Sequence, residues 1–211
     1  LEKHLNNKKI NFSLYPSLEA QVSAIADDIA YNNHDLEDGL RSQLFLINNI
    51  SKIPLLKELV KKHAHNSKLY RREIIVNQII RELINLMVID VIKTTSRNIS
   101  KIKPKKINDI YNAGMLIVDF SSKMKEIDYQ LKNFLKKNMY NNKKVIVNTN
   151  KGKKIIKVLF NCLLKKPSKY IDKKSIKENG LKRAIADFIS GMTDRYAINL
   201  YKRLQWIDRK S

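Results

Sequence analysis

Residues that break helices or cross-link chains are scarce in this sequence. Its 211 residues include 5 Gly and 4 Pro, while apolar residues make up 43%. This composition is typical of a globular, helix-rich chain and not of a disordered one. The single cysteine, Cys162, excludes an internal disulfide and fits a reducing compartment. We therefore expect an all-α fold and a cytoplasmic location.

Long hydrophobic runs are missing as well. The longest apolar run, around Leu83 to Ile92, contains Asp90 and is too short to span a bilayer. No signal peptide is visible, although the chain begins at Leu1 without a methionine. Residues 1–15 resemble the end of an interrupted element followed by a polar loop, which is a poor beginning for a domain. We expect no membrane contact and a chain cut from a longer protein.

Acidic residues are few, since 20 Asp and Glu stand against 42 Lys and Arg, for a net charge of +22. Such a charge is typical of proteins that bind nucleic acid or another polyanion. Only nine of the basic residues are Arg, however, and the lysines are spread along the whole chain. Abundant Lys, Asn and Ile also result from the codon bias of AT-rich genomes. We interpret most of the charge as solvated surface and keep a nucleic-acid surface as an alternative.

The scarce acids are concentrated in residues 16–41. A Pro-Ser pair and apolar residues at helical spacing predict a helix from about Ser17 to His34. Its apolar stripe consists of Leu18, Val22, Ile25 and Ile29. At ~100° per residue, Asp27, Tyr31 and Asp35 fall within a sector of about 80°. We expect this helix to be buried on one side and to present two carboxylates and a phenol to a cleft on the other.

From Glu19 to Arg41 the sequence reads Glu-Ala-Gln-Val-Ser-Ala-Ile-Ala-Asp-Asp-Ile-Ala-Tyr-Asn-Asn-His-Asp-Leu-Glu-Asp-Gly-Leu-Arg. This segment resembles the deoxynucleoside triphosphate triphosphohydrolases, a family of the HD metal-dependent phosphohydrolase superfamily. Shorter matches follow at Arg81 to Asp90, Phe134 to Tyr140 and Arg183 to Ala197. The resemblance covers roughly Ser13 to Leu204, nearly the whole chain.

The resemblance implies a helical bundle like the C-terminal half of the family's catalytic protein. We expect residues 1–211 to form a single all-α unit. Residues 1–40 would end the HD catalytic core and carry its last metal-ligand Asp, and residues 41–211 would form the C-terminal helical region. The first half of the HD domain would then be absent from this chain.

The resemblance also implies roles for three residues of the acidic helix. In the family, the first Asp of Ala-Asp-Asp-Ile-x-Tyr completes a metal site begun by an upstream His and a His-Asp pair, and this position is Asp27. The family's Tyr one turn on contacts the nucleotide and is Tyr31 here. The Asp a further turn on reaches the deoxyribose 3′-hydroxyl and is Asp35. Without the resemblance, a solvated Asp and a packed Tyr are the ordinary interpretations.

The implied reaction converts a dNTP, such as dGTP, to the deoxynucleoside and inorganic triphosphate with a divalent metal, Mg²⁺, Mn²⁺ or another transition metal. The upstream His and His-Asp motifs are not found in this sequence. His34-Asp35 looks like the missing pair, but it lies inside the later motif. Because one carboxylate cannot hold a catalytic ion, we expect this chain alone to bind metal weakly and to be inactive.

A long helical pattern runs from Lys68 to about Ser100. At its start, Arg71 and Arg72 are candidate triphosphate contacts, because guanidinium groups bind phosphate oxygens in a bidentate manner. A surface pair, or an ion pair with Glu73, is the alternative. Near the chain's end, the pattern predicts one helix from Leu181 to about Leu204.

Two alternatives to an enzyme remain at this point. The basic faces would bind single-stranded nucleic acid without catalysis, although aromatic residues among the lysines are sparse. The second alternative is a degenerate homologue that has no activity of its own and only assembles with other subunits. The family resemblance also implies a homo-oligomer.

Overall fold

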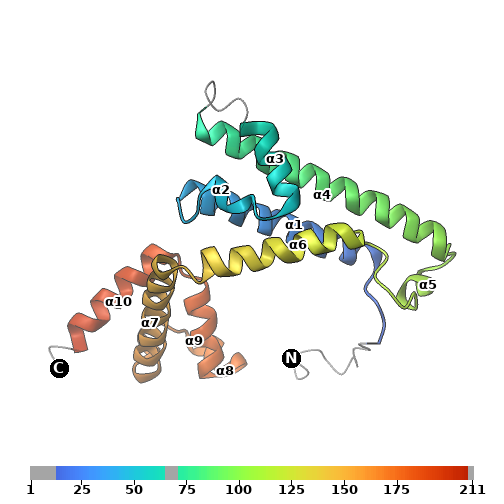
Figure 1. Ribbon diagram of the computed structural model, residues 1–211. Coiled ribbons are helices and arrows are strands. Elements are labelled where there is room, and N and C mark those ends of the chain that lie inside the picture. The colour runs from blue at the N-terminus through green and yellow to red at the C-terminus, as the bar shows by residue number, and fades with distance from the viewer. Residues whose placement is uncertain (1–12, 65–70, 209–211) are drawn as a thin grey trace. The chain divides into compact units, whose positions relative to one another are not determined.

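The computed structural model describes residues 13–64 and 71–208, and every element of regular structure in these ranges is a helix (Figure 1). The predicted all-α fold class is therefore confirmed. The chain groups into two compact units, Leu1–Asn142 and Lys143–Ser211. We expected a single unit over residues 1–211. Two compact units form because each has an apolar cluster of its own.

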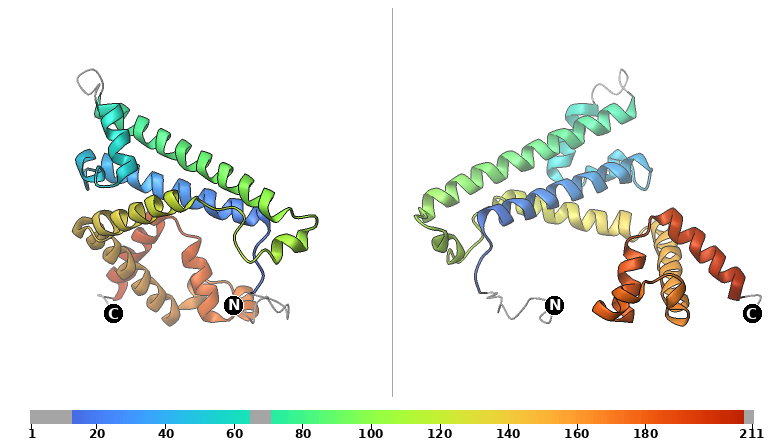
Figure 2. Two further views of the ribbon diagram at one scale, coloured as in Figure 1. Left: turned by 45° about the vertical axis from the view of Figure 1, so that its right-hand side comes forward. Right: turned by 180° about the vertical axis from the view of Figure 1, so that it is seen from behind.

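In the described part of the first unit, five α-helices build or border the core, and one short π-helical turn follows them. Their bounds are α1 Leu18–Arg41, α2 Ile47–Ile50, α3 Pro54–Ala64, α4 Arg72–Ile102, α6 Ser122–Leu135 and η2 Lys136–Tyr140. A further short helix, α5 Ile107–Tyr111, lies in the connection between α4 and α6. Helix α1 lies between α4 and α6, as the views of Figure 2 show.

Helix α4 is the central element of this unit, as its long apolar pattern predicts. It packs against both α1 and α3. It begins at Arg72, after the extended N-cap residue Arg71, and the expected first residue, Lys68, lies outside the described residues. The buried residues of α4 recur at helical spacing and are Ile75, Val76, Ile79, Ile80, Leu83, Met87, Val91 and Thr94. Helix α1 packs on this helix, although Val22 of its predicted apolar stripe stays 51% exposed.

Helix α1 is longer than predicted. It begins after its N-cap residue Ser17, whose hydroxyl accepts a hydrogen bond from the Ala20 N–H (3.3 Å), but it continues beyond His34 to Arg41. The polar run around His34 contains poor helix formers. Leu36 and Leu40, both fully buried, lie on the core side of this extension. Their burial outweighs the weak helix propensity of their neighbours.

Gly39 lies inside α1, where its lack of a side chain permits a close contact. A Cβ atom at this position would lie 2.2 Å from Cζ of Phe45. The Phe45 ring is buried and meets Phe134 of α6 edge to face, with ring centroids 4.9 Å apart. The turn after α1 therefore folds back onto the helix, and Phe45 joins α1 to α6.

The second unit consists of α7 Lys143–Lys165, the 3₁₀ turn η3 Pro167–Lys169, α8 Lys173–Asn179, α9 Leu181–Ser190 and α10 Asp194–Asp208. Its buried cluster includes Leu163 of α7 and Ile185 of α9. The prediction of a single helix from Leu181 to Leu204 is wrong, because the helix is interrupted between Ser190 and Asp194. Thr193 Oγ1 accepts a hydrogen bond from the Tyr196 N–H (3.3 Å) and so begins a new helix after Gly191.

We predict that Gly39→Ala destabilises the first unit. The added methyl group overlaps the ring of Phe45, which cannot rotate away because Phe134 packs against it. Overpacking of this kind costs about 1–3 kcal/mol, more than the gain in helix propensity. Urea unfolding followed by circular dichroism measures the change.

The matched control is Gly152→Ala in the middle of α7. No atom lies within 4 Å of a Cβ built there. This substitution should stabilise its helix by about 0.5–1 kcal/mol. Equal stabilisation by both substitutions would show that the Phe45 contact places no constraint on position 39.

Candidate functional site

The predicted polar stripe of α1 is present in the structure. Asp27 and Tyr31 are exposed and Asp35 is half-buried, all within the continuous helix. The helix holds them at successive turns, about 6 Å apart along its axis. The opposite side of α1 is buried through Ile29 and Leu36. The helix is therefore anchored by its apolar side while its polar side stays accessible.

Tyr140 joins this stripe from a distant part of the sequence. Its hydroxyl donates a hydrogen bond to Oδ2 of Asp35 and also contacts Tyr31. It is the last residue of the π-helical turn η2, which follows α6. Burial raises the pKa of the Tyr140 phenol, and the hydrogen bonds to Asp35 and Tyr31 raise it further. Tyr140 therefore stays a neutral hydrogen-bond donor, and it holds the Asp35 carboxylate in place.

A second polar cluster lies beside the stripe and joins α1 to α6. The Lys132 ammonium is 2.9 Å from Oδ2 of Asp28 and 2.8 Å from Oδ2 of Asp128. Asn32 donates to Asp128 Oδ1 over 3.3 Å. Burial by itself lowers the pKa of Lys132, but the hydrogen bonds to Asp128 and Asp28 outweigh this effect, so the pKa is raised. Asp28 therefore has a structural partner, whereas its neighbour Asp27 does not share in this cluster.

Asp27 presents its carboxylate without a hydrogen bond or ion pair to any described residue. Over residues 13–64 and 71–208, no three His, Cys, Asp or Glu side chains gather as a set of metal ligands. A catalytic ion needs several protein ligands and an open position. The described residues alone therefore do not fit such an ion, although Asp27 is placed to contribute one ligand.

His34 lies on nearly the same side of α1 as Asp27, about 20° away around the helix. The two side chains start about 10 Å apart along the axis, which is too far for both to bind one ion directly. The His34 imidazole is exposed and lies 3.9 Å from Glu37. This geometry favours the interpretation that His34-Asp35 is not the metal-binding pair.

The two candidate phosphate-binding arginines lie at the start of α4. Arg72 is half-buried and donates through Nη2 to the carbonyl oxygen of Leu40 (3.2 Å), while Arg71 is exposed. Leu40 is near the C-terminal end of α1, about 20 Å along the axis from Asp27. Arg72 thus ties α4 to the end of α1. Triphosphate binding by either arginine stays a prediction.

Two residues of the matched motifs hold segments together. Gln21 is buried, and its Oε1 accepts hydrogen bonds from the N–H groups of Ile117 (2.8 Å) and Val118 (3.1 Å). Asp90 accepts from the N–H of Ser121 (2.8 Å) and from its hydroxyl (2.7 Å). Both residues lie in segments that resemble the family, but sequence alone did not assign them these contacts.

The segment from Ile117 to Phe120 has a β-like composition but forms no strand. The N–H groups of Ile117 and Val118 are bonded to the Gln21 side chain instead of to a neighbouring strand. Asn98 of α4 donates to the Ile117 carbonyl oxygen (2.9 Å) from the other side. Side chains of α1 and α4 thus replace a β-ladder and fix the start of α6 beside the acidic helix.

A helical unit with a polar stripe of carboxylates and phenols is consistent with a phosphohydrolase component, and the comparisons agree. Residues 118–203 match the family described as the phosphohydrolase-associated domain. The resemblance to the dNTP triphosphohydrolases is confirmed, because the chain is homologous over 92% of its length to the deoxyguanosinetriphosphate triphosphohydrolase-like protein of Pelagibacter ubique (strain HTCC1062).

This relative is 51% identical over 194 residues, which make up 52% of its own length. Proteins with the same description from Bartonella tribocorum and Brucella ovis are 40% and 35% identical, with 49% and 50% of their lengths covered. The chain therefore spans about half the length of the curated relatives it matches. Within its described part, no helix is long and apolar enough to cross a membrane.

The pKa of Tyr140 generates a prediction about stability and pH. The raised pKa means that the folded state favours the neutral phenol, so its stabilisation is fully present below the ordinary value of 10.0. It is lost as the pH rises above this value, because the phenol then ionises in the unfolded chain first. The difference in free energy of unfolding between the unsubstituted protein and Tyr140→Phe should shrink above this pH. Denaturant unfolding from about pH 8 to about pH 11 measures it.

Tyr129→Phe is the control, because Tyr129 lies in α6, the helix directly before η2, and is 63% exposed. It removes the same hydroxyl group from a tyrosine outside the Asp35 contact. Its effect on the free energy of unfolding should be small, because the exposed side chain contributes little to the packing. A pH-independent difference for Tyr140→Phe would contradict the proposed bond to Asp35.

Proposed function

We propose that the full-length protein containing this chain is a metal-dependent dNTP triphosphohydrolase. It would convert a dNTP, such as dGTP, to the deoxynucleoside and inorganic triphosphate. One observation carries the proposal: Tyr31, Asp35 and Tyr140 come together on the exposed side of α1, beside the Asp27 carboxylate, which has no partner among the described residues. The names of the relatives support the same activity.

The cluster around Asp35 is suited to a sugar. A carboxylate offers about four acceptor positions, and the Tyr140 hydroxyl occupies one on Oδ2. The remaining positions can accept the 3′-hydroxyl of a deoxyribose. Tyr31 is 58% exposed and presents a ring face and a hydroxyl group beside them. We propose that Asp35 binds the sugar and that Tyr31 contacts the nucleotide, while Tyr140 positions Asp35.

Asp27 would bind a divalent ion, Mg²⁺, Mn²⁺ or another transition metal, as one of several ligands. When bound, such an ion activates water and polarises a phosphoryl oxygen. Because the described residues do not supply the other ligands, we propose that they come from the part of the relatives' length that this chain does not span. Arg71 and Arg72 remain candidates for the triphosphate, and a homo-oligomer remains the proposed assembly.

The test uses a chimera in which residues 1–211 replace the matched half of the Pelagibacter ubique relative. The unsubstituted chimera should release inorganic triphosphate from dGTP or another dNTP. Asp27→Ala should abolish this release and reduce bound metal, because the ion loses a ligand. Asp35→Ala should keep the metal but reduce kcat/KM by an amount equivalent to about 1.5–3 kcal/mol, as for a lost charge-assisted hydrogen bond.

His34→Ala is the matched control, since His34 is exposed and lies between the proposed site residues in sequence. It should leave metal content and triphosphate release nearly unchanged. Residues 1–211 alone should release no triphosphate above background with Mg²⁺ or Mn²⁺. If activity survives in Asp27→Ala but is lost in His34→Ala, the assignment of the metal ligand is wrong.

A second candidate function is the binding of single-stranded nucleic acid by the second unit. Residues 143–211 hold 19 of the 42 basic residues but only 5 of the 20 acidic ones. Helix α7 contains seven lysines and no acid, and its Lys154 and Lys157 are exposed. The positive charge is therefore much denser in this unit than in the first, which favours contact with a polyanion.

Removal of α7 charges tests this binding. Lys154→Ala with Lys157→Ala should weaken binding of a fluorescent oligothymidine. It should also flatten the slope of log K against log salt by about 0.7 for each lost phosphate contact. The control is Lys57→Ala with Lys61→Ala on α3, which removes the same charge from exposed positions of the first unit. Equal losses with both pairs would indicate attraction by net charge without a binding surface on α7.

A further inference from the structure

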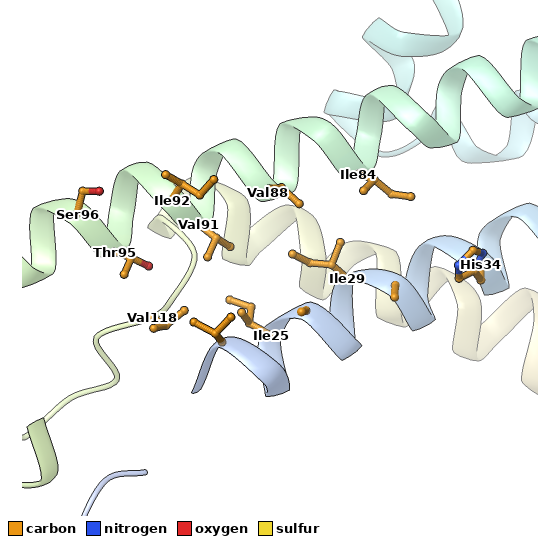
Figure 3. Close-up of a pocket in the computed structure, with 13 residues that line it drawn as sticks. Ile25, Ile29, His34, Ile84, Val88, Val91, Ile92, Thr95, Ser96 and Val118 are labelled. Atoms are coloured by element: carbon orange, nitrogen blue, oxygen red, sulfur yellow. The ribbon is translucent and has the colours of Figure 1, made fainter. Parts of the chain in front are cut away.

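An apolar groove of about 450 Å³ runs between α1 and α4 (Figure 3). Side chains of both helices point into it, and Val118 closes one end. Ile25 and Ile29 form its α1 wall, and Val88 and Ile92 belong to its α4 wall. The two helices pack on each other, but this packing leaves the outer rim of the groove open to solvent.

Large aliphatic side chains along this rim are open to solvent. Ile92 is 58% exposed, Val22 is 51% exposed and Val88 is 39% exposed. Val22 belongs to the apolar stripe that we expected to be buried, and the structure leaves it exposed. A contiguous apolar surface of this kind marks a protein interface. The groove therefore lacks a covering element in the described part of the chain.

A buried polar atom in the same wall also lacks a partner. Oγ1 of Thr95 is shielded from solvent and makes no hydrogen bond with any described residue. Buried hydroxyl groups are almost always hydrogen-bonded in folded proteins. An occupant of the groove that brings a donor or acceptor to Thr95 would satisfy it.

We propose that the groove is the docking surface for the half of the relatives' length that this chain does not span. The chain covers 52% of the Pelagibacter ubique relative and 49% of the Bartonella tribocorum relative, so each has about as much polypeptide outside the match as inside it. The identity of this occupant rests on the proposed function. Apolar residues from that half would complete the core on the open side of α1.

The position of the groove connects docking to the metal ligand. Ala26 and Ala30 line the groove, and Asp27 lies within about 100° of both around the helix. A segment seated in the groove therefore passes beside the Asp27 carboxylate and is placed to add further ligands there. A second copy of this chain fits less well, because pairing two such grooves about a two-fold axis would bring both Asp27 carboxylates to one interface.

The test measures how accessible position 92 is in two proteins, residues 1–211 alone and the chimera defined above. Each carries Ile92→Cys, and mass spectrometry follows labelling of that cysteine by a maleimide. Labelling should be about tenfold slower in the chimera, because a covered thiol reacts slowly. Tyr129→Cys is the control, since Tyr129 is 63% exposed and its labelling rate should be the same in both proteins.

A second variant reports on the same surface without labelling. Ile92→Lys should leave the unfolding midpoint of residues 1–211 unchanged, because the side chain is exposed there, and should lower the midpoint of the chimera. Equal labelling at position 92 in both proteins, or equal midpoint shifts, would overturn the proposal. Labelling of residues 1–211 alone that slows with protein concentration would assign the groove to a second copy and would also overturn it.

Neither readout requires a metal ion or a nucleotide. A chimera that covers position 92 but releases no triphosphate would contradict the proposed function and leave the docking proposal standing. A chimera that releases triphosphate, but whose position 92 is labelled as fast as in residues 1–211 alone, would contradict the docking proposal. The proposed function would then stand.

Discussion

The packing of α1 between α4 and α6 is the constraint on which the first unit depends. Ile29 and Leu36 bury one side of α1, while Lys132 bridges Asp28 of α1 to Asp128 of α6 on another. The apolar contact supplies most of the stabilisation, because exposed or half-exposed ion pairs contribute little. The polar bridge instead fixes the rotation of α6 relative to α1. Through that rotation Tyr140 reaches Asp35.

Helix α1 has two distinct sides. One holds the core together and, through Ile25 and Ile29, also forms a wall of the open groove, while the other carries Asp27 and the Asp35 cluster. Asp35 has its hydrogen-bond partner, Tyr140, within the described residues. Among the same residues, Asp27 has no partner and the groove has no covering element. The carboxylate that we propose as a metal ligand and an uncovered apolar surface lie close together on one helix, and the proposed docking partner would complete the surroundings of both.

The second unit has a smaller core than the first and a surface rich in lysine. Its small buried cluster joins α7 to α9, and the solvent side of α7 is rich in lysine. Residues 118–203, which match the phosphohydrolase-associated domain, extend over parts of both units. The match therefore does not follow the division into compact units. The dense positive charge of residues 143–211 distinguishes the second unit from the first, whose helix α1 carries an acidic surface.

The sequence by itself determined the all-α fold class, the long central helix and the common side of Asp27, Tyr31 and Asp35. These features depend on helical periodicity, which is local. Only the tertiary structure decided that α1 continues through Gly39, that the helix after Leu181 breaks near Gly191, and that Val22 stays exposed. It alone joined Tyr140 to Asp35 across 105 positions. Periodicity sets how side chains are distributed around a helix axis, but which element covers each side depends on burial summed over distant segments.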